Sequence, residues 1–372
     1  MNQPGAPILR WRGVSFSYGD LRAVDALSLD VAAGEMFGLI GPDGAGKTTS
    51  LRMALGLLKP ESGEIETCGL DPRGQHRELT QRVGYLSQRF SLYGDLTVDE
   101  NIAFFARVHG VKGWKKRRDE LLEMVRMTPF RKRLADRLSG GMKQKLALSC
   151  TLIHTPELLI LDEPTTGVDP VSRRDFWLLL AHLQQDGLSI VMTTPYLDEA
   201  ERCQRVAMMN RAQLLAVDDP NALRESFPHV VVELVAKPRR PAVALLRERT
   251  DISHVEAFGE RLHVFLPRGA GARLEVDGQA GDAAPTEESV SEEEGATTEK
   301  GAPAEMRAPV EKRAPVERSI ELLIEDLRSQ GIDVSSCRRV TPSLEDVFIA
   351  MISALEPEGA SEPVNEMNEV SA

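Results

Sequence analysis

The sequence lacks long apolar runs, and it holds fewer basic than acidic residues. Nowhere do about 18 apolar residues follow one another, the length that a membrane-spanning helix needs, so we expect any membrane span to come from another chain. The first residues also lack the apolar core of a signal peptide. Lys and Arg number 45 against 57 Asp and Glu, and the net charge of -12 argues against a nucleic-acid partner.

Cysteine is scarce and scattered. The four cysteines are far apart and form no CxxC pair: Cys68, Cys150, Cys203 and Cys337. This spacing argues against a structural zinc site and against a disulfide framework. The thiols fit a reducing cytosol best.

Short apolar runs alternate with helical patterns from Ile8 to about Phe227. Strands are predicted at 36–40 and 158–161, and helices at 47–58 and 172–185. This alternation is typical of an α/β domain with a mainly parallel sheet. Since 372 residues exceed one typical domain, we expect a smaller second domain as well.

The pattern changes near residue 229. Strands are predicted at 229–236 and 261–267, with a helix between them, and an amphipathic helix is predicted to end at Gly331. We expect a small α+β accessory domain made of residues 228–269 and 319–354.

Residues 270–318 are rich in Glu, Ala, Pro, Gly and Thr, with 12 acidic and 6 basic residues. Because so few large apolar side chains cannot offset the entropy of ordering, we expect a disordered insertion. It is either a plain solvated linker or a regulatory, partner-binding tract. The tail, 355–372, is also expected to be disordered.

The motif GPDGAGKT, Gly41 to Thr48, satisfies G-x-x-x-x-G-K-[ST] between a predicted strand and a predicted helix. Glycines let the backbone approach a triphosphate, Lys47 brings a positive charge to the outer phosphates, and Thr48 offers an oxygen to Mg²⁺. The residues predicted to bind the nucleotide here are Gly41, Pro42, Asp43, Gly44, Ala45, Gly46, Lys47, Thr48 and Thr49.

The run LLILDEP, 158–164, is an apolar strand that ends in two carboxylates. Asp162 suits the support of a divalent cation bound to phosphate, and Glu163 suits the activation of an attacking water. Taken alone, the pair is equally typical of a solvated strand end. Beside a phosphate-binding loop, the catalytic interpretation is favoured.

A third motif, LSGGMKQ at 138–144, precedes a helical stretch. The three motifs in this order resemble the ATP-binding cassette (ABC) family over residues 8–227. The resemblance implies a P-loop cassette that binds ATP and Mg²⁺, with a mainly parallel sheet, antiparallel N-terminal strands and a helical subdomain at about 89–155. It also implies that Ser139, Gly140 and Gly141 bind the nucleotide of an opposite cassette, so that ATP joins a homodimer or a heterodimer.

Other family positions match in order. Tyr18 stands where the family stacks an aromatic ring on adenine, although such a residue is also an ordinary strand aromatic. Gln88 matches the glutamine that contacts Mg²⁺ and water. Asp169 matches an aspartate that acts across the dimer. The resemblance therefore implies Lys47, Gln88 and Glu163 as catalytic residues.

One position departs from the family. Pro195 stands where the family has a histidine that reaches the γ-phosphate, and none of the seven histidines lies between His182 and His229. Proline offers no donor. We favour an active ATPase because the lysine, glutamine and both carboxylates remain. The alternatives are a slow or non-hydrolysing regulatory subunit and a soluble cassette ATPase without a transport role.

The stretches 91–105, 196–203 and 341–352 resemble cassettes of drug-resistance and polysaccharide exporters. This resemblance implies a separate polytopic permease and a peripheral place on the cytoplasmic face of a bacterial inner membrane. The loop Arg89–Asp95 would form part of a groove for a permease helix, or Leu92 and Tyr93 would simply pack locally. The transported substrate is not predictable, because cassettes of this kind do not contact it.

Overall fold

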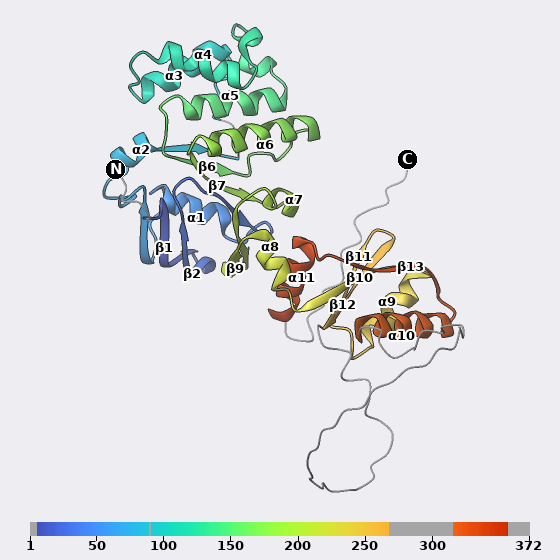
Figure 1. Ribbon diagram of the computed structural model, residues 1–372. Coiled ribbons are helices and arrows are strands. Elements are labelled where there is room, and N and C mark those ends of the chain that lie inside the picture. The colour runs from blue at the N-terminus through green and yellow to red at the C-terminus, as the bar shows by residue number, and fades with distance from the viewer. Residues whose placement is uncertain (1–5, 89–90, 268–314, 356–372) are drawn as a thin grey trace, which may run out of the picture. The chain divides into compact units, whose positions relative to one another are not determined.

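The computed structural model describes residues 6–88, 91–267 and 315–355 (Figure 1). The chain divides into two units. Unit 1 holds the residues up to Ser226 and resumes at Ser343, and unit 2 runs from Phe227 to Pro342.

Within the described part of unit 1, the main sheet has six strands in the order β5-β6-β7-β3-β8-β9. The first five are parallel, and β9 is antiparallel to β8. All residues of β3 and β6 are buried, which explains why these strands are continuously apolar. The strands are β3 (Met36–Ile40), β5 (Val83–Leu86), β6 (Leu158–Asp162), β7 (Ser189–Thr194), β8 (Arg205–Asn210) and β9 (Gln213–Asp218).

A second sheet of unit 1 is antiparallel, in the order β2-β1-β4. Its strands are β1 (Leu9–Tyr18), β2 (Leu21–Val31) and β4 (Ser62–Thr67). One core joins the two sheets and contains Trp11, Phe37 and Leu51. The predicted fold class, an α/β cassette with a mainly parallel sheet and antiparallel N-terminal strands, is confirmed.

Helices connect and cover the strands of unit 1. Three of them, α3, α4 and α5, fall within the range expected for a helical subdomain, and α3 starts at a capping box formed by Thr97 and Glu100. Helix α1 ends four residues earlier than predicted, because Gly56 takes a left-handed conformation with φ +71°. The helices are α1 (Lys47–Ala54), α2 (His76–Arg82), α3 (Val98–Val108), α4 (Trp114–Met124), α5 (Gly140–Leu152), α6 (Pro170–Gln185), α7 (Leu197–Ala200) and α8 (Pro220–Glu225), with short 3-10 turns at Thr128–Phe130 and Ala135–Arg137.

In its described parts, 227–267 and 315–342, unit 2 is an antiparallel sheet in the order β11-β12-β10-β13 with two helices. Alternate strand residues such as Val232 and Val264 form its core together with Leu246 of α9 and Leu323 of α10. Its elements are β10 (His229–Lys237), α9 (Arg239–Arg247), β11 (His254–Phe258), β12 (Arg261–Pro267), α10 (Pro315–Ser329) and β13 (Asp333–Val340).

Two predicted boundaries differ from the structure. Helix α11 (Leu344–Leu355) groups with unit 1, because its apolar face packs near α7 and α8 and buries Leu344 and Val347. The accessory domain therefore ends near Pro342, and not at 354. Helix α10 begins at Pro315, inside the range predicted to be an insertion. The rest of that insertion, 268–314, and the tail from 356 lie outside the described residues.

Candidate nucleotide-binding site

The loop between β3 and α1 has a backbone shape that requires glycine. Gly41 has φ +152° and Gly46 has φ +104°. A Cβ added at Gly41 would overlap the carbonyl oxygen of Met209, and one at Gly46 would overlap that of Ala23. Gly46 precedes the first residue of helix α1 and offers no side chain to cap it, so the first N–H groups of the helix remain for an anion. The other predicted loop residues are the exposed Pro42, Asp43 and Gly44 and the buried Ala45 and Thr49.

Lys47, the first residue of α1, is folded back onto the loop. Its side chain is 4% exposed, and Nζ donates to the carbonyl oxygens of Gly41 at 2.8 Å and Pro42 at 3.0 Å. The same nitrogen lies 3.7 Å from Oε1 of Glu163. A buried ammonium group thus stands directly beside the helix start.

Asp162, the last residue of β6, lies beside the loop. Its Oδ1 accepts hydrogen bonds from the hydroxyls of Thr48 at 2.8 Å and Thr193 at 2.7 Å, and Oδ2 lies 3.5 Å from the Tyr85 hydroxyl. Burial and the nearby Asp162 carboxylate raise the pKa of Tyr85 to about 12. A hydroxyl and a carboxylate that share this position are the hard oxygen donors that Mg²⁺ prefers.

Glu163 follows in a left-handed conformation with φ +46°. Its Oε2 accepts a hydrogen bond from Nε2 of Gln88 at 2.9 Å. Five residues that the sequence singled out therefore meet within hydrogen-bonding or ion-pair distance: Lys47, Thr48, Gln88, Asp162 and Glu163.

The predicted signature residues form a second cluster. Ser139 caps α5 and accepts a hydrogen bond from the Met142 N–H at 3.4 Å, while Asp169 caps α6 and accepts one from the Ser172 N–H at 2.9 Å. A Cβ on Gly141 would overlap the Ser172 side chain, so the two helix starts are tightly packed.

This second cluster is linked to the end of β6 and not to the phosphate loop. The Gln144 side chain donates to the carbonyl oxygen of Pro164. Among the described residues, no recorded hydrogen bond or ion pair joins Ser139, Gly140 or Asp169 to the loop at Gly41–Thr48. Hydrogen bonding to Ser172 lowers the pKa of the exposed Asp169 carboxyl.

Tyr18 belongs to neither cluster. It ends β1, is 46% exposed, and makes an edge-to-face contact with Phe16 at a centroid distance of 4.9 Å. Its ring is available to a planar ligand.

Three residues around the carboxylates were not predicted from the sequence: Tyr85, Thr193 and Glu199. Glu199 is 1% exposed, and its carboxylate accepts hydrogen bonds from Thr165 at 2.5 Å and Thr194 at 2.8 Å. It thereby ties Thr194, the residue before Pro195, to α7. Thr193 pairs in register with Asp162 on the neighbouring parallel strand, and this placement becomes visible only in the assembled sheet.

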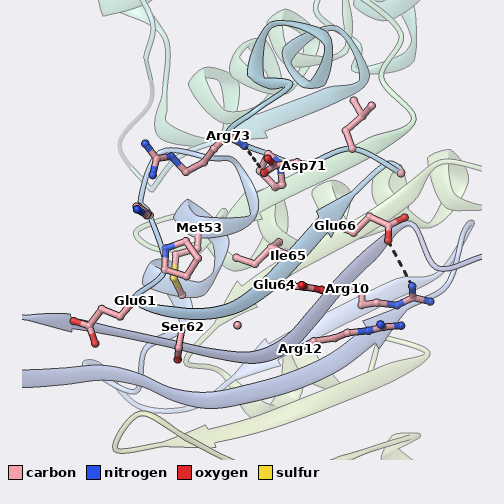
Figure 2. Close-up of a pocket in the computed structure, with 16 residues that line it drawn as sticks. Arg10, Arg12, Met53, Glu61, Ser62, Glu64, Ile65, Glu66, Asp71 and Arg73 are labelled. Carbon is pink, nitrogen blue, oxygen red and sulfur yellow. Dashed lines mark hydrogen bonds and ion pairs between the residues drawn. The ribbon is translucent and has the colours of Figure 1, made fainter.

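Figure 2 shows another pocket, of about 760 Å³, between β1, β4 and the loop before α2. Acidic and basic side chains lie close together in this pocket. For example, Nη1 of Arg10 lies 3.5 Å from Oε2 of Glu66. None of the predicted site residues lines it.

A glycine loop between a strand and a helix, a buried lysine at the helix start and an acidic pair at the end of a nearby strand define a P-loop nucleotide-binding protein. The match to known proteins is more specific. A family model described as ABC transporter matches residues 24–166. Nod factor export ATP-binding protein I of Burkholderia lata is 38% identical over 284 residues, which are 75% of this chain and 92% of that protein. The chain belongs to the ABC transporter family, among its ATP-binding subunits.

Other similarities agree with this assignment. The probable multidrug ABC transporter ATP-binding protein YbhF of Escherichia coli is 47% identical over 210 residues, 56% of this chain. The match spans only 36% of that relative's length. A solved ATP-binding subunit of an ABC transporter superposes with a TM-score of 0.55 at 27% identity, covering 59% of this chain and 93% of that one. A bacterial ABC transporter cassette solved as a dimer gives 0.52 at 25% identity, covering 57% and 98%.

Proposed function

We propose that this chain binds ATP with Mg²⁺, dimerises around the nucleotide and hydrolyses it to power export through a separate membrane permease. The observation that carries the proposal is the meeting of Asp162 and Glu163 with Thr48, Gln88 and Lys47 at the end of β6. This set contains an oxygen pair for the cation, a base and a positive charge for the phosphates.

Each residue has a definite task in the proposal. Lys47 exchanges its loop carbonyls for phosphate oxygens. Thr48 and Asp162 would hold Mg²⁺, which neutralises phosphate charge when bound. Glu163 orients an attacking water and accepts its proton, and Gln88, which now donates to Glu163 at 2.9 Å, fixes the direction of that carboxylate.

The second cluster supports a dimer. Ser139 and the two following glycines present a hydroxyl and backbone amides at the start of α5, a typical anion site. A nucleotide phosphate from another cassette is the ligand that we assign to this anion site. A relative of known structure was solved as a dimer.

The permease would dock at a pocket of about 240 Å³ in unit 1, and not at the predicted loop 89–95, of which residues 89 and 90 lie outside the described residues. Its walls come from the ends of α1 and α3, from α2, β5 and α5, and include Leu57, Leu79 and Phe105. Leu57 is 55% exposed, and nearby Tyr93 and Phe104 form an exposed edge-to-face pair. An apolar groove of this kind suits a short amphipathic helix.

A membrane-bound partner is part of the proposal. No helix among the described residues has both the length and the apolar character needed to cross a bilayer. We place the chain on the cytoplasmic face of a bacterial inner membrane, attached through its permease. Export as the direction follows the name of one relative, the Nod factor export ATP-binding protein I.

A second candidate function is favoured by one observation. Pro195 offers no side-chain donor near the end of β7, so a regulatory subunit that binds ATP and hydrolyses it slowly is the competing proposal.

Substitution of the base separates these proposals. Glu163→Gln should abolish phosphate release and leave ATP-dependent dimers that are visible by size-exclusion chromatography. Glu157→Gln, at the opposite end of β6 and exposed, is the matched control and should retain activity. Undiminished phosphate release in Glu163→Gln would refute the assignment of the base. Tight ATP binding with no release by the unmodified chain would favour the regulatory subunit.

A further inference from the structure

We propose that Thr193 is a positioning residue that sets the orientation of Asp162 relative to Glu163. The inference rests on the proposed function, since it concerns the same acidic pair. Thr193 lies on β7, which is the parallel neighbour of β6, and the register places it directly beside Asp162. Pro195, the position that departs from the family, lies two residues further along the chain. The hydrogen bonds to the acidic pair are made by Thr193.

One hydroxyl connects the two carboxylate residues. Thr193 Oγ1 donates its hydrogen to Oδ1 of Asp162 at 2.7 Å, and it accepts a hydrogen from the backbone N–H of Glu163 at 3.0 Å. A hydroxyl group has one hydrogen and two lone pairs, so both contacts can form together. Thr193 is 0% exposed, and no solvent competes for either hydrogen bond.

The same contacts hold a strained backbone. Glu163 has φ +46°, a conformation that a residue with a side chain rarely adopts. Its N–H is shared between Oγ1 and the carbonyl oxygen of Thr193, at 3.0 Å and 3.2 Å. The left-handed turn directs the Glu163 side chain toward Gln88 and Lys47. Its Oε2 accepts the hydrogen bond from Gln88, and its Oε1 lies 3.7 Å from Nζ of Lys47.

Asp162 is fixed by two hydroxyls on one oxygen. Thr48 and Thr193 both donate to Oδ1, one from the phosphate loop and the other from β7. Without Thr193, only Thr48 and the longer contact with Tyr85 remain, and the carboxylate gains freedom to rotate. Looser placement of Asp162 weakens a cation site, and looser placement of Glu163 slows the chemical step.

Three variants test the proposal. Thr193→Val keeps the shape of the side chain and removes the hydroxyl, whereas Thr193→Ser keeps the hydroxyl. Thr67→Val is the matched control: Thr67 is also 0% exposed in unit 1, and its hydroxyl donates at 2.8 Å to a backbone carbonyl, that of Ala54.

Two readouts are measured. The first is the Mg²⁺ concentration that gives half-maximal binding of a fluorescent ATP analogue, and the second is steady-state phosphate release. We expect Thr193→Val to raise the Mg²⁺ concentration about tenfold and to lower kcat about 10- to 100-fold, the range implied by losing a hydrogen bond to a charged group. KM for ATP should change by no more than about twofold. Thr193→Ser should resemble the unmodified chain, and Thr67→Val should lower only the melting temperature.

Normal Mg²⁺ dependence in a folded Thr193→Val protein would overturn the proposal, and so would an equal shift in Thr67→Val. If Thr193→Val does not fold, Thr193→Cys keeps the volume with a much weaker donor and takes its place. If the unmodified chain releases no phosphate, hydrolysis as the function fails, while the Mg²⁺ readout still decides the role of Thr193.

Discussion

His109 and His154 stack face to face, with ring centroids 4.0 Å apart and planes inclined by 3°. His109 follows α3, and His154 follows α5 and makes a hydrogen bond through Nε2 to the carbonyl oxygen of Val83 at 3.2 Å. Burial lowers the pKa of both rings, and burial together with the charge of His109 brings the pKa of His154 to about 4. The pair is therefore held in the neutral form at neutral pH.

This stack predicts a loss of stability in acid. The pKa of His154 is lower in the folded chain than the ordinary value near 6.5, so the unfolded chain binds more protons between about pH 6.5 and pH 4. The free energy of unfolding should fall as the pH falls through this window. For a partly exposed ring we expect roughly 2 kcal/mol.

Denaturant unfolding of His154→Gln checks the effect. The variant should lose much of the pH dependence between pH 6.5 and pH 4, whereas His182→Gln should keep it, because His182 is 61% exposed. Equal pH dependence in both variants would exclude the stack as its source.

The phosphate loop should not tolerate a side chain at Gly46. In Gly46→Ala the new methyl group would overlap the Ala23 carbonyl oxygen at a φ of +104°, and we expect a loss of about 3 kcal/mol with no nucleotide binding. Gly187→Ala is the control that has the backbone strain without the overlap. Its φ is +94°, but no atom lies within 4 Å of an added Cβ, so we expect it to lower the free energy of unfolding by only about 1 kcal/mol. Thermal unfolding and ATP titration measure the two effects, and equal losses in both variants would argue against overlap.

Restoring the missing donor should speed hydrolysis. Pro195→His places an imidazole between Thr194 and Tyr196, where the family has one, and we expect kcat to rise about tenfold with little change in KM for ATP. Phosphate release under saturating ATP is the measurement. An unchanged kcat would mean that the site of this chain does not depend on that contact.

A charge in the apolar pocket should weaken docking. Leu57→Glu would place a carboxylate among Leu79 and Phe105, and we expect at least a tenfold loss of affinity for the permease in a pull-down with membranes. ATP binding should persist. Leu178→Glu, at a residue on α6 that is 61% exposed, is the control and should dock normally. Equal docking by both variants would show that the permease does not bind at this pocket.

Local patterns predicted most of the cassette fold. The run of five buried residues in β3 and the glycine motif after it fixed the position of the loop, and the apolar strand before Asp162 fixed the acidic pair. Strands β11 and β13 were not predicted, because HVEAF is short and DVSSCRRV is largely polar. Most side chains of β13 are exposed or half-buried, so the strand does not need an apolar sequence.

The remaining misses depend on contacts between distant parts of the chain. Helix α11 has the composition of any amphipathic helix, and only its packing near α8 assigns it to unit 1. Two adjacent threonines at 193 and 194 are ordinary strand residues in sequence. Their different partners, Asp162 and Glu199, become visible only when β6, β7 and α7 are assembled.

The resting place of Lys47 bears on how ATP would be retained. Its ammonium group already makes two hydrogen bonds to the carbonyls of Gly41 and Pro42 in a nearly solvent-free position. Arrival of a triphosphate would be an exchange of acceptors, with little water released from the lysine itself. We therefore expect Lys47 to add little net affinity for the triphosphate, so that the nucleotide left after hydrolysis can dissociate.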